Sequence, residues 1–153
     1  TMSIDVREVT ESDAPQWRGL YAGYRDFYHL PEDADAVETT WRWVSQREHG
    51  MIGLVAVAEA DGSLLGLANL RRFARPSFAA TGLYLDDLFT APSARRRGVA
   101  GSLLRAARER AAAEGANVVR WITAADNTTA RSLYDQVATA TSWVTYDMKP
   151  DLE

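Results

Sequence analysis

One segment near the middle of the chain constrains the fold most, because it reads as a strand, a turn and a helix in succession. The strand signal is Tyr84–Thr90, an apolar run that carries the adjacent carboxylates of Asp86 and Asp87. Four residues later, a basic turn with a glycine at 95–98 opens into the helical apolar spacing of 99–104. Backbone N–H groups and the positive dipole end at such a helix N-terminus bind phosphate groups. The segment therefore predicts a strand and a helix joined at an anion-binding turn.

Composition limits the chain to one domain and excludes several kinds of chemistry. With 153 residues, 46% of them hydrophobic, we expect one core and a single domain over residues 1–153. The absence of cysteine excludes disulfides, thiolate metal sites and cysteine nucleophiles. No apolar run approaches the ~20 residues of a membrane span, and Thr1–Asp5 lacks a basic-then-apolar targeting pattern. We expect a cytoplasmic protein with no membrane partner.

The charge is acidic overall but locally basic. The net charge is −4, whereas six arginines fall between positions 95 and 110. A nucleic-acid-binding protein needs a broader basic face, usually with aromatic side chains for base stacking. A local basic site on an acidic protein suits a phosphorylated cofactor better, so we expect no nucleic-acid partner.

Hydrophobic periodicity and turn residues predict the remaining elements. Asp61-Gly62 between two apolar runs is a strong hairpin signal, and Gly115 is expected to end a helix. Strand, helix and strand within 80–123 predict a parallel crossover unit in an otherwise antiparallel sheet, hence an α/β (α+β) fold. The expected strands are 4–9, 51–60, 64–70, 80–90, 118–123 and 142–148. Four helices are expected: one after the cap residues at 10–13, one after the break at 31–33, and two that span 97–115 and 127–137.

The spacing R-x-x-G-x-A at Arg95–Ala100 places small residues where backbone amides can approach a ligand. By itself the pattern is equally consistent with a tight strand-to-helix turn packed on the sheet. Neither a P-loop Lys-Ser/Thr nor a dinucleotide G-x-G-x-x-G is present, which disfavours nucleoside triphosphates and NAD.

Two motifs in order resemble the GCN5-related N-acetyltransferase (GNAT) superfamily. Its acetyl-CoA loop has the form Q/R-x-x-G-x-G/A, like Arg95–Ala100, and its second motif has the form N-x-x-A-x-x-L-Y, like Asn127–Tyr134. Residues 84–90, 24–28 and 40–41 are also similar to polyamine acetyltransferases and the Hpa2-like group. The resemblance implies the GNAT fold, with six to seven strands flanked by about four helices, and acetyl-CoA (coenzyme A) as cofactor.

The resemblance also implies a cofactor site made largely of backbone groups. Amides at 96–101 would hold the pyrophosphate, and an N–H near Leu88 or Phe89 would polarise the thioester carbonyl. Main-chain groups of 89–91 would pair with the pantetheine arm like an added strand. The implied cofactor-binding residues are Leu88, Phe89, Thr90, Ala91, Arg95, Arg96, Arg97, Gly98, Val99, Ala100, Gly101, Ser102, Asn127, Ala130, Arg131 and Tyr134.

Three residues are implied as catalytic. An alkylamine with a pKa near ~10.4 must lose a proton before it attacks. Asp86 stands where the polyamine enzymes carry a glutamate base and, being shorter, would act through a water; Asp87 is its neighbour with the opposite side-chain direction. Alternatively the two carboxylates bind a cationic substrate or cap a turn. Tyr134 matches the family tyrosine that protonates the thiolate, although its spacing also fits a core residue, as Asn127 also fits a helix cap.

The acceptor is expected to be a small cationic amine, because acidic residues gather at 32–35 and 86–87. The expected acceptor-binding residues are Tyr24, Tyr28, His29, Trp41 and Asp86. Alternatively, His29 is a solvated loop residue, and Trp17, Tyr21, Trp41 and Trp43 are more typical of a core. The spacing of the two histidines predicts no metal site.

We expect direct acetyl transfer from acetyl-CoA to a primary amine in a ternary complex, with a polyamine or diamine as acceptor. The alternative acceptors are an amino acid and a protein lysine, and the alternative function is that of a coenzyme A-binding regulator without turnover. A homodimer is the family expectation. Two departures from the family pattern stand out, namely Arg96 in place of a common glycine, and 136–143, which lacks the usual Gly-Phe or Gly-Tyr.

Overall fold

A computed structural model describes residues 3–151 of the chain, which forms two compact units divided after Trp121. Residues 1–2 and 152–153 lie outside the described residues. The expected domain 1–153 includes all four of them, and the segment Thr1–Asp5, which lacks a targeting pattern, includes the first two. The first unit contains a five-stranded sheet in the order β1-β2-β3-β4-β5. Its strands are β1 (Ile4–Glu8), β2 (Met51–Ala58), β3 (Leu64–Arg75), β4 (Ala80–Thr90) and β5 (Val119–Arg120).

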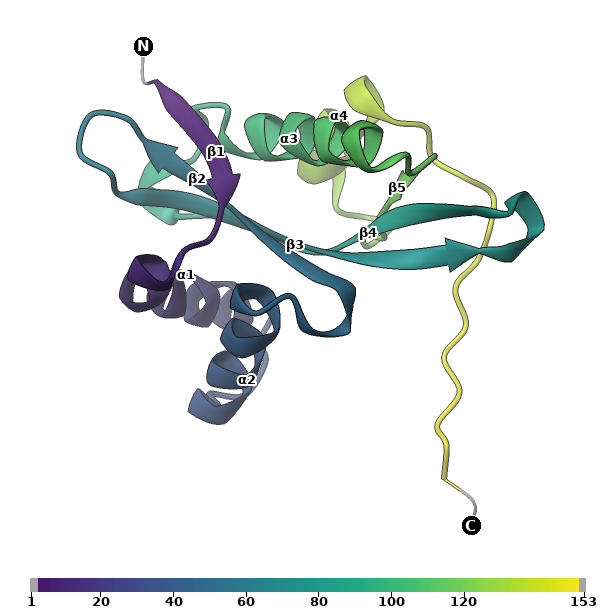
Figure 1. Cartoon of the computed structure of the whole chain (residues 1–153), viewed down its shortest axis with the longest axis horizontal. Coiled ribbons are helices and arrows are strands. Elements are labelled where there is room, and N and C mark those ends of the chain that lie inside the picture. Colours follow the sequence, from purple (N-terminus) through teal and green to yellow (C-terminus); the bar gives the residue numbers. More distant parts are fainter. Residues whose placement is uncertain (1–2, 152–153) are drawn as a thin grey trace. The chain divides into compact units, whose positions relative to one another are not determined.

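Helices cover both faces of this sheet. In Figure 1, α1 (Ala14–Phe27) and α2 (Ala34–Ser45) lie on one side, and α3 (Val99–Glu114) lies on the other. The second unit contains α4 (Thr128–Val137). Within 3–151, no helix is both long enough and apolar enough to cross a membrane.

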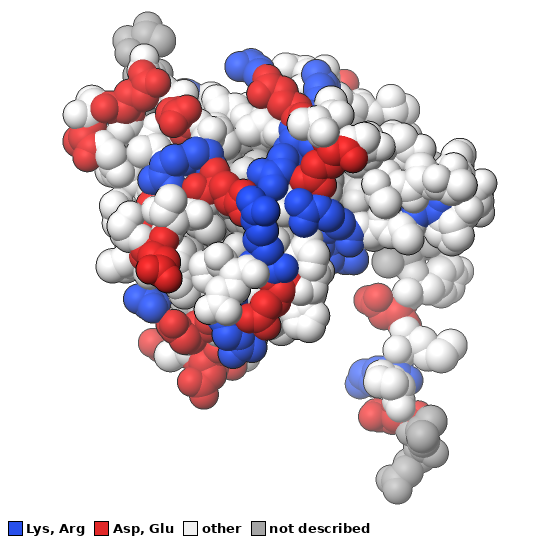
Figure 2. Space-filling model, in the orientation of Figure 1, with Lys and Arg blue, Asp and Glu red and all other residues white. Residues whose placement is uncertain are grey.

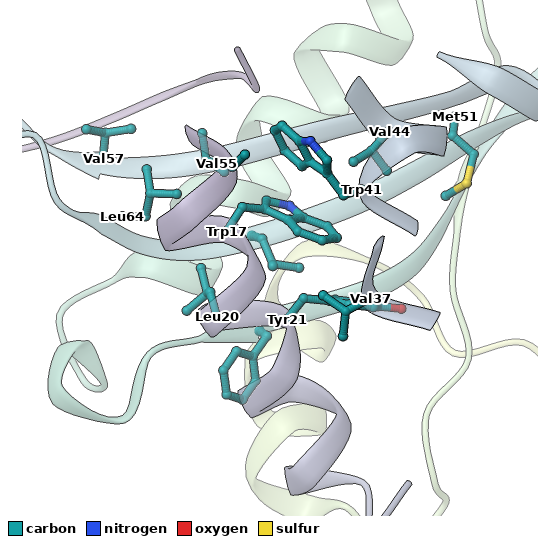
Figure 3. Packing of buried hydrophobic residues seen from close by; sticks show 13 residues of the cluster. Trp17, Leu20, Tyr21, Val37, Trp41, Val44, Met51, Val55, Val57 and Leu64 are labelled. Atoms are coloured by element: carbon teal, nitrogen blue, oxygen red, sulfur yellow. The ribbon is translucent and has the colours of Figure 1, made fainter. Parts of the chain in front are cut away.

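The core explains why β2 is apolar along its whole length. Every residue of β2 is buried, because α1 and α2 cover one face of the strand and α3 covers the other. On the α1 and α2 side, Trp17 is completely buried and lies between Tyr21 and Trp41, with ring centroids 4.9 and 5.2 Å away (Figure 3). These aromatic contacts fix how α1 and α2 pack on the sheet.

A close approach at Gly66 positions α3. A Cβ at Gly66 would lie 2.7 Å from the backbone oxygen of Phe89 and 2.7 Å from Cγ1 of Val99. No side chain fits there, so the first turn of α3 packs directly against β3 beside the end of β4. The turn that begins α3 is thereby held next to the carboxyl end of β4.

Most of the predicted elements are present. The hairpin at Asp61-Gly62 is confirmed, with Gly62 at φ 74° and antiparallel pairing of β2 with β3. Gly115 ends α3 in the left-handed conformation, at φ 74°. The crossover unit is also confirmed, since β5 is parallel to β4, and the fold is a mixed, mostly antiparallel α+β sheet.

The main differences lie near the C-terminus. The predicted strand Ser142–Met148 is wrong, because this segment is extended without strand pairing, and β5 is only two residues long. The described sheet therefore has five strands rather than six to seven. The alternation of apolar residues at 142–148 favours a strand, but a strand needs a hydrogen-bonding neighbour that local sequence does not specify.

Candidate active site

The adjacent carboxylates of β4 lie at an irregularity in its pairing with β3. Asn69 pairs with Asp87, but the next residue of β3, Leu70, pairs with Leu85, so Asp86 is an extra residue on β4. This is a β-bulge, which bends its strand and redirects neighbouring side chains. Strict alternation would send Asp86 and Asp87 to opposite faces. With the bulge, both side chains line the same cavity.

Asp86 is held by an arginine of the neighbouring strand. Arg71 Nε donates to both carboxylate oxygens of Asp86, at 3.2 and 3.0 Å, and its guanidinium lies 4.4 Å from the ring centre of Tyr84. Burial raises the pKa of Asp86; Arg71 opposes this shift, and the charge of Asp87 adds to it. A carboxylate with a raised pKa takes up a proton more readily, which suits a general base.

Asp87 accepts hydrogen bonds from two other elements. Asn69 Nδ2 donates to Asp87 Oδ2 at 2.9 Å, and Tyr21 Oη donates to the same oxygen at 3.3 Å. Burial, and then the charge of Asp87, raise the pKa of Tyr21 to about 12. The same two causes also raise the pKa of Tyr24. Both phenols are therefore protonated near neutral pH and act as hydrogen-bond donors.

The cavity has a volume of about 260 Å³ and is lined by residues of α1, α2, the turn at His49, and the strands β2, β3 and β4. Pockets for drug-sized ligands have volumes of about 300–1,000 Å³, so this cavity fits a small molecule or one end of a larger one. Its lining residues are Tyr21, Thr40, Trp43, His49, Met51, Arg71, Asp86 and Asp87.

The turn before α3 presents backbone amides. Gly98 precedes the helix at φ 82°, no side chain caps the first turn, and the amide of Ser102 donates to the carbonyl of Gly98 at 3.0 Å. The amides of 99–101 come before this first intrahelical bond and have no partner within the helix. A Cβ built at Gly98 or Gly101 would meet no atom within 4 Å. The first turn therefore has open space beside its backbone amides, and anion binding there stays a prediction.

The arginines of this turn are exposed. Arg96, which stands where the family commonly has glycine, has a φ of 64°, the left-handed region that glycine enters at no steric cost. The turn thus keeps a glycine-like backbone and adds a positive side chain. Arg95 lies over Phe27, with its guanidinium 5.4 Å from the ring centre, and Arg97 is exposed.

The outer edge of β4 becomes open after Tyr84. Pairing with β5 ends there, and in the described sheet no other strand follows along that edge. The amide of Ala91 donates to the carbonyl of Leu65 at 2.8 Å, so alternation turns the backbone groups of Leu88 and Thr90 away from β3. Residues 89–91 are those expected to pair with pantetheine. The backbone groups of Thr90 point to the open edge of the sheet, whereas the amide of Ala91 is hydrogen-bonded to β3. Phe89 is buried against Tyr24.

The second motif forms the start of α4. The side chain of Asn127 caps this helix by accepting a hydrogen bond from the amide of Ala130 at 3.4 Å. Arg131 donates to the carbonyl of Ala125 at 2.6 Å, and Tyr134 is half-buried. Positions 127, 130, 131 and 134 share one helix face, so this unit presents the motif side chains together. The predicted cap is confirmed, and contact of these residues with the cofactor stays a prediction.

Of the expected acceptor residues, only Asp86 lines the cavity. Trp41 packs in the core against Trp17, and His29 is an exposed turn residue at φ 56°. Tyr24 and Tyr28 contact each other, with ring centroids 4.9 Å apart. The cavity residues that sequence reasoning did not assign to the acceptor are Tyr21, Thr40, Trp43, His49, Met51 and Arg71.

No cluster of side chains suited to a metal ion occurs in the part of the chain that the structure describes.

Comparison with known proteins identifies the family. The acetyltransferase (GNAT) family model matches residues 14–138. The uncharacterised N-acetyltransferase YhfO of Bacillus subtilis is 31% identical over 137 residues, covering 87% of this chain and 87% of that protein. The D-amino-acid N-acetyltransferase HPA3 of Saccharomyces cerevisiae is 26% identical over 143 residues, and the match covers 94% of this chain and 89% of that protein.

Solved structures share the fold. A probable acetyltransferase has a TM-score of 0.86 at 22% identity, covering 97% of this chain and 99% of that chain. The aminoglycoside N-acetyltransferase AAC(6')-Iy, solved with CoA, has a TM-score of 0.82 at 22% identity, covering 99% of this chain and 97% of that chain.

The chain belongs to the acetyltransferase (GNAT) family. It is thus an acetyl-CoA-dependent N-acetyltransferase, which confirms the class, fold and cofactor that its two motifs predict.

Proposed function

We propose that this protein transfers the acetyl group of acetyl-CoA directly to the primary amine of a small cationic acceptor, such as a diamine or polyamine. The observation that carries the proposal is the bulge at Asp86, which turns both carboxylates into one small cavity. Two carboxylates in a partly buried site attract an ammonium group strongly. Tyr21 and Trp43 add aromatic surface, which also favours cations.

The cofactor would bind along the open edge of β4 and over the first turn of α3. The outward backbone groups of Leu88 and Thr90 would pair with the pantetheine amides, and the amide of Leu88 would donate to the thioester oxygen. The amides of 99–101, assisted by the arginines at 95–97, would bind the pyrophosphate. Asn127, Ala130 and Arg131 stay proposed cofactor-binding residues because of the family motif to which they belong.

The acceptor nitrogen loses two protons in the reaction, and the thiolate gains one. The acceptor ammonium loses the first proton, its free amine attacks the thioester carbonyl to form the C–N bond, and the C–S bond breaks to release the thiolate of coenzyme A. The second proton, lost as the nitrogen becomes an amide, would restore the Tyr134 hydroxyl after that residue has protonated the thiolate. We assign the first transfer to Asp86, through a bound water, because burial raises the pKa of this carboxyl group. Asp87, already bonded to Asn69 and Tyr21, would bind the cation instead. Tyr134 would protonate the leaving thiolate.

An amino-acid acceptor is the second candidate, because the name of one relative specifies D-amino acids. The charges of the cavity disfavour it, since the carboxylate of an amino acid would meet Asp86 and Asp87 with only Arg71 as a counter-charge, already paired to Asp86. A protein lysine and a role as a coenzyme A-binding regulator stay as further alternatives.

We propose that the whole chain is one acetyltransferase domain and that it forms a homodimer. The family model spans both compact units, which supports the first statement. For the second, the extended C-terminal segment exposes large apolar side chains that a partner would bury. They are Trp143, Val144, Tyr146 and Met148, each at least 76% exposed.

The test is an acceptor panel with detection of free thiol. Diamines and polyamines should release coenzyme A from acetyl-CoA faster than neutral or acidic amino acids do, and mass spectrometry should find monoacetylated product. A protein that binds coenzyme A but releases none with any amine would contradict the proposal and favour the regulator.

A further inference from the structure

Two rings of the cavity wall have no part in the proposed proton transfers. Trp43 and His49 meet edge to face, with centroids 4.9 Å apart and planes at 78°. Trp43 is half-buried and His49 is exposed, so the pair lies where the cavity opens to solvent. We call these two rings the aromatic rim.

The backbone that carries His49 is strained. Residues 47–50, which we call the 47–50 turn, join α2 to β2, and φ is 55° at Arg47, 57° at His49 and 71° at Gly50. Glycine adopts these angles freely, but side-chain-bearing residues do so only at a cost. Such strain persists where the surrounding structure imposes it, and it is concentrated at functional sites.

Ion pairs hold the 47–50 turn in place. Arg47 donates to both carboxylate oxygens of Glu8 in β1, at 2.7 and 2.6 Å, and Glu8 also accepts from Arg110 of α3 at 3.3 Å. Arg42 donates to Glu48 at 3.2 Å. Basic and acidic side chains likewise lie next to each other on the face drawn in Figure 2. The turn is thus linked directly to β1 and α2, and through Glu8 to α3.

We propose that the aromatic rim binds the part of the acceptor beyond its reacting amine, so that His49 selects acceptors by length. This inference rests on the proposed acetyl transfer to a small cationic amine. A short diamine reaches Asp86 and Asp87 without touching the rim, whereas a longer diamine passes along both rings. Both rings would stabilise methylene groups by contact, and the face of Trp43 would attract a second ammonium group by a cation–π interaction.

The experiment uses the series from 1,2-diaminoethane to 1,6-diaminohexane with full-length protein. For the wild type, kcat/KM should rise with chain length. In His49→Gly this rise should flatten, and KM for the longest diamine should increase about threefold to tenfold, as expected for the loss of one aromatic contact. KM for acetyl-CoA should stay unchanged, because the rim lies on the acceptor cavity.

Two comparisons separate recognition from stability. His49→Ala should show the same kinetic change as His49→Gly, but its Tm should be about 2–4 °C lower, because alanine keeps the strained φ. Ala79→Gly is the matched control for strain, since Ala79 has φ 50° in the turn between β3 and β4 and does not line the cavity. It should raise Tm without changing the chain-length profile.

The outcomes distinguish the two proposals. An active His49→Gly with the wild-type KM and chain-length profile would overturn the role of His49 alone. A flattened profile in His29→Gly instead would also overturn it, in favour of the histidine that the sequence suggests. A wild type that acetylates no amine in the series or the wider panel would overturn both proposals.

Discussion

Replacing Gly101 by alanine should stabilise the protein and weaken its binding to coenzyme A. Gly101 lies in the first turn of α3, and a Cβ built there meets no atom within 4 Å. Alanine is more favourable than glycine inside a helix by roughly 0.5–1 kcal/mol. The free energy of unfolding should rise by this amount, which corresponds to a Tm increase of about 1–4 °C.

The same open space is where we propose that the pyrophosphate meets the amides of 99–101. A methyl group there would keep the phosphate oxygens beyond hydrogen-bond distance of at least one amide. A hydrogen bond to a charged group contributes about 1.5–3 kcal/mol, so Kd for coenzyme A should increase about tenfold to a hundredfold. Thermal unfolding by circular dichroism and titration calorimetry with coenzyme A measure the two effects on one preparation.

Gly19 provides the matched control. It lies in α1, and a Cβ built there also meets no atom within 4 Å. Gly19→Ala should raise Tm by a similar amount and leave Kd for coenzyme A unchanged. If Gly101→Ala raises Tm but keeps the wild-type Kd, the pyrophosphate does not bind at the first turn of α3. A lower Tm would instead refute the reasoning about open space.

Three further variants test the chemistry and the stability. Tyr134→Phe should lower kcat about a hundredfold, the usual contribution of a general acid, in the thiol-release assay, and an unchanged kcat would refute the acid assignment. Because the pKa of Asp86 is raised, kcat/KM should fall as pH decreases through that pKa, and Asp86→Asn should lose this limb of the pH profile. Arg7 donates to both oxygens of the buried Asp13 carboxylate, at 2.7 and 2.9 Å, and lowers its pKa. The stability from this pair is therefore complete above the unfolded-state pKa of about 3.9 and is lost as pH falls through the folded-state pKa. Asp13→Asn should destabilise the protein by about 1–3 kcal/mol at pH 7 in urea unfolding, and by less near pH 3.

Local signals were sufficient for much of the fold. The Asp61-Gly62 hairpin and the Gly115 helix end depend on backbone angles that only a few residue types accept, so their sequence is informative by itself. The helix cap at Asn127 likewise depends on a contact within one helical turn. The order of the two motifs also predicted the family, because each keeps its chemistry within one short segment.

The cavity could not be predicted in this way, because its residues meet only through packing. Trp41 and Trp43 are two positions apart on α2, so they point in different directions, and the packing of α1 decides that Trp41 enters the core. His49, and not His29, lines the cavity, because the 47–50 turn leads directly into β2, whose first residue Met51 also lines it. Neither choice has a local signature.

Residues 84–104 show what local sequence determines and what only the folded sheet decides. They determine a strand with two carboxylates, a turn before a helix N-terminus, and the helix itself, since each of these properties depends on neighbours in the chain. Whether Asp86 and Asp87 act together depended on β3, because the bulge exists only where Asn69 and Leu70 pair across β4. Strand alternation alone puts the two carboxylates on opposite faces, and the pairing of the folded sheet brings them into one site.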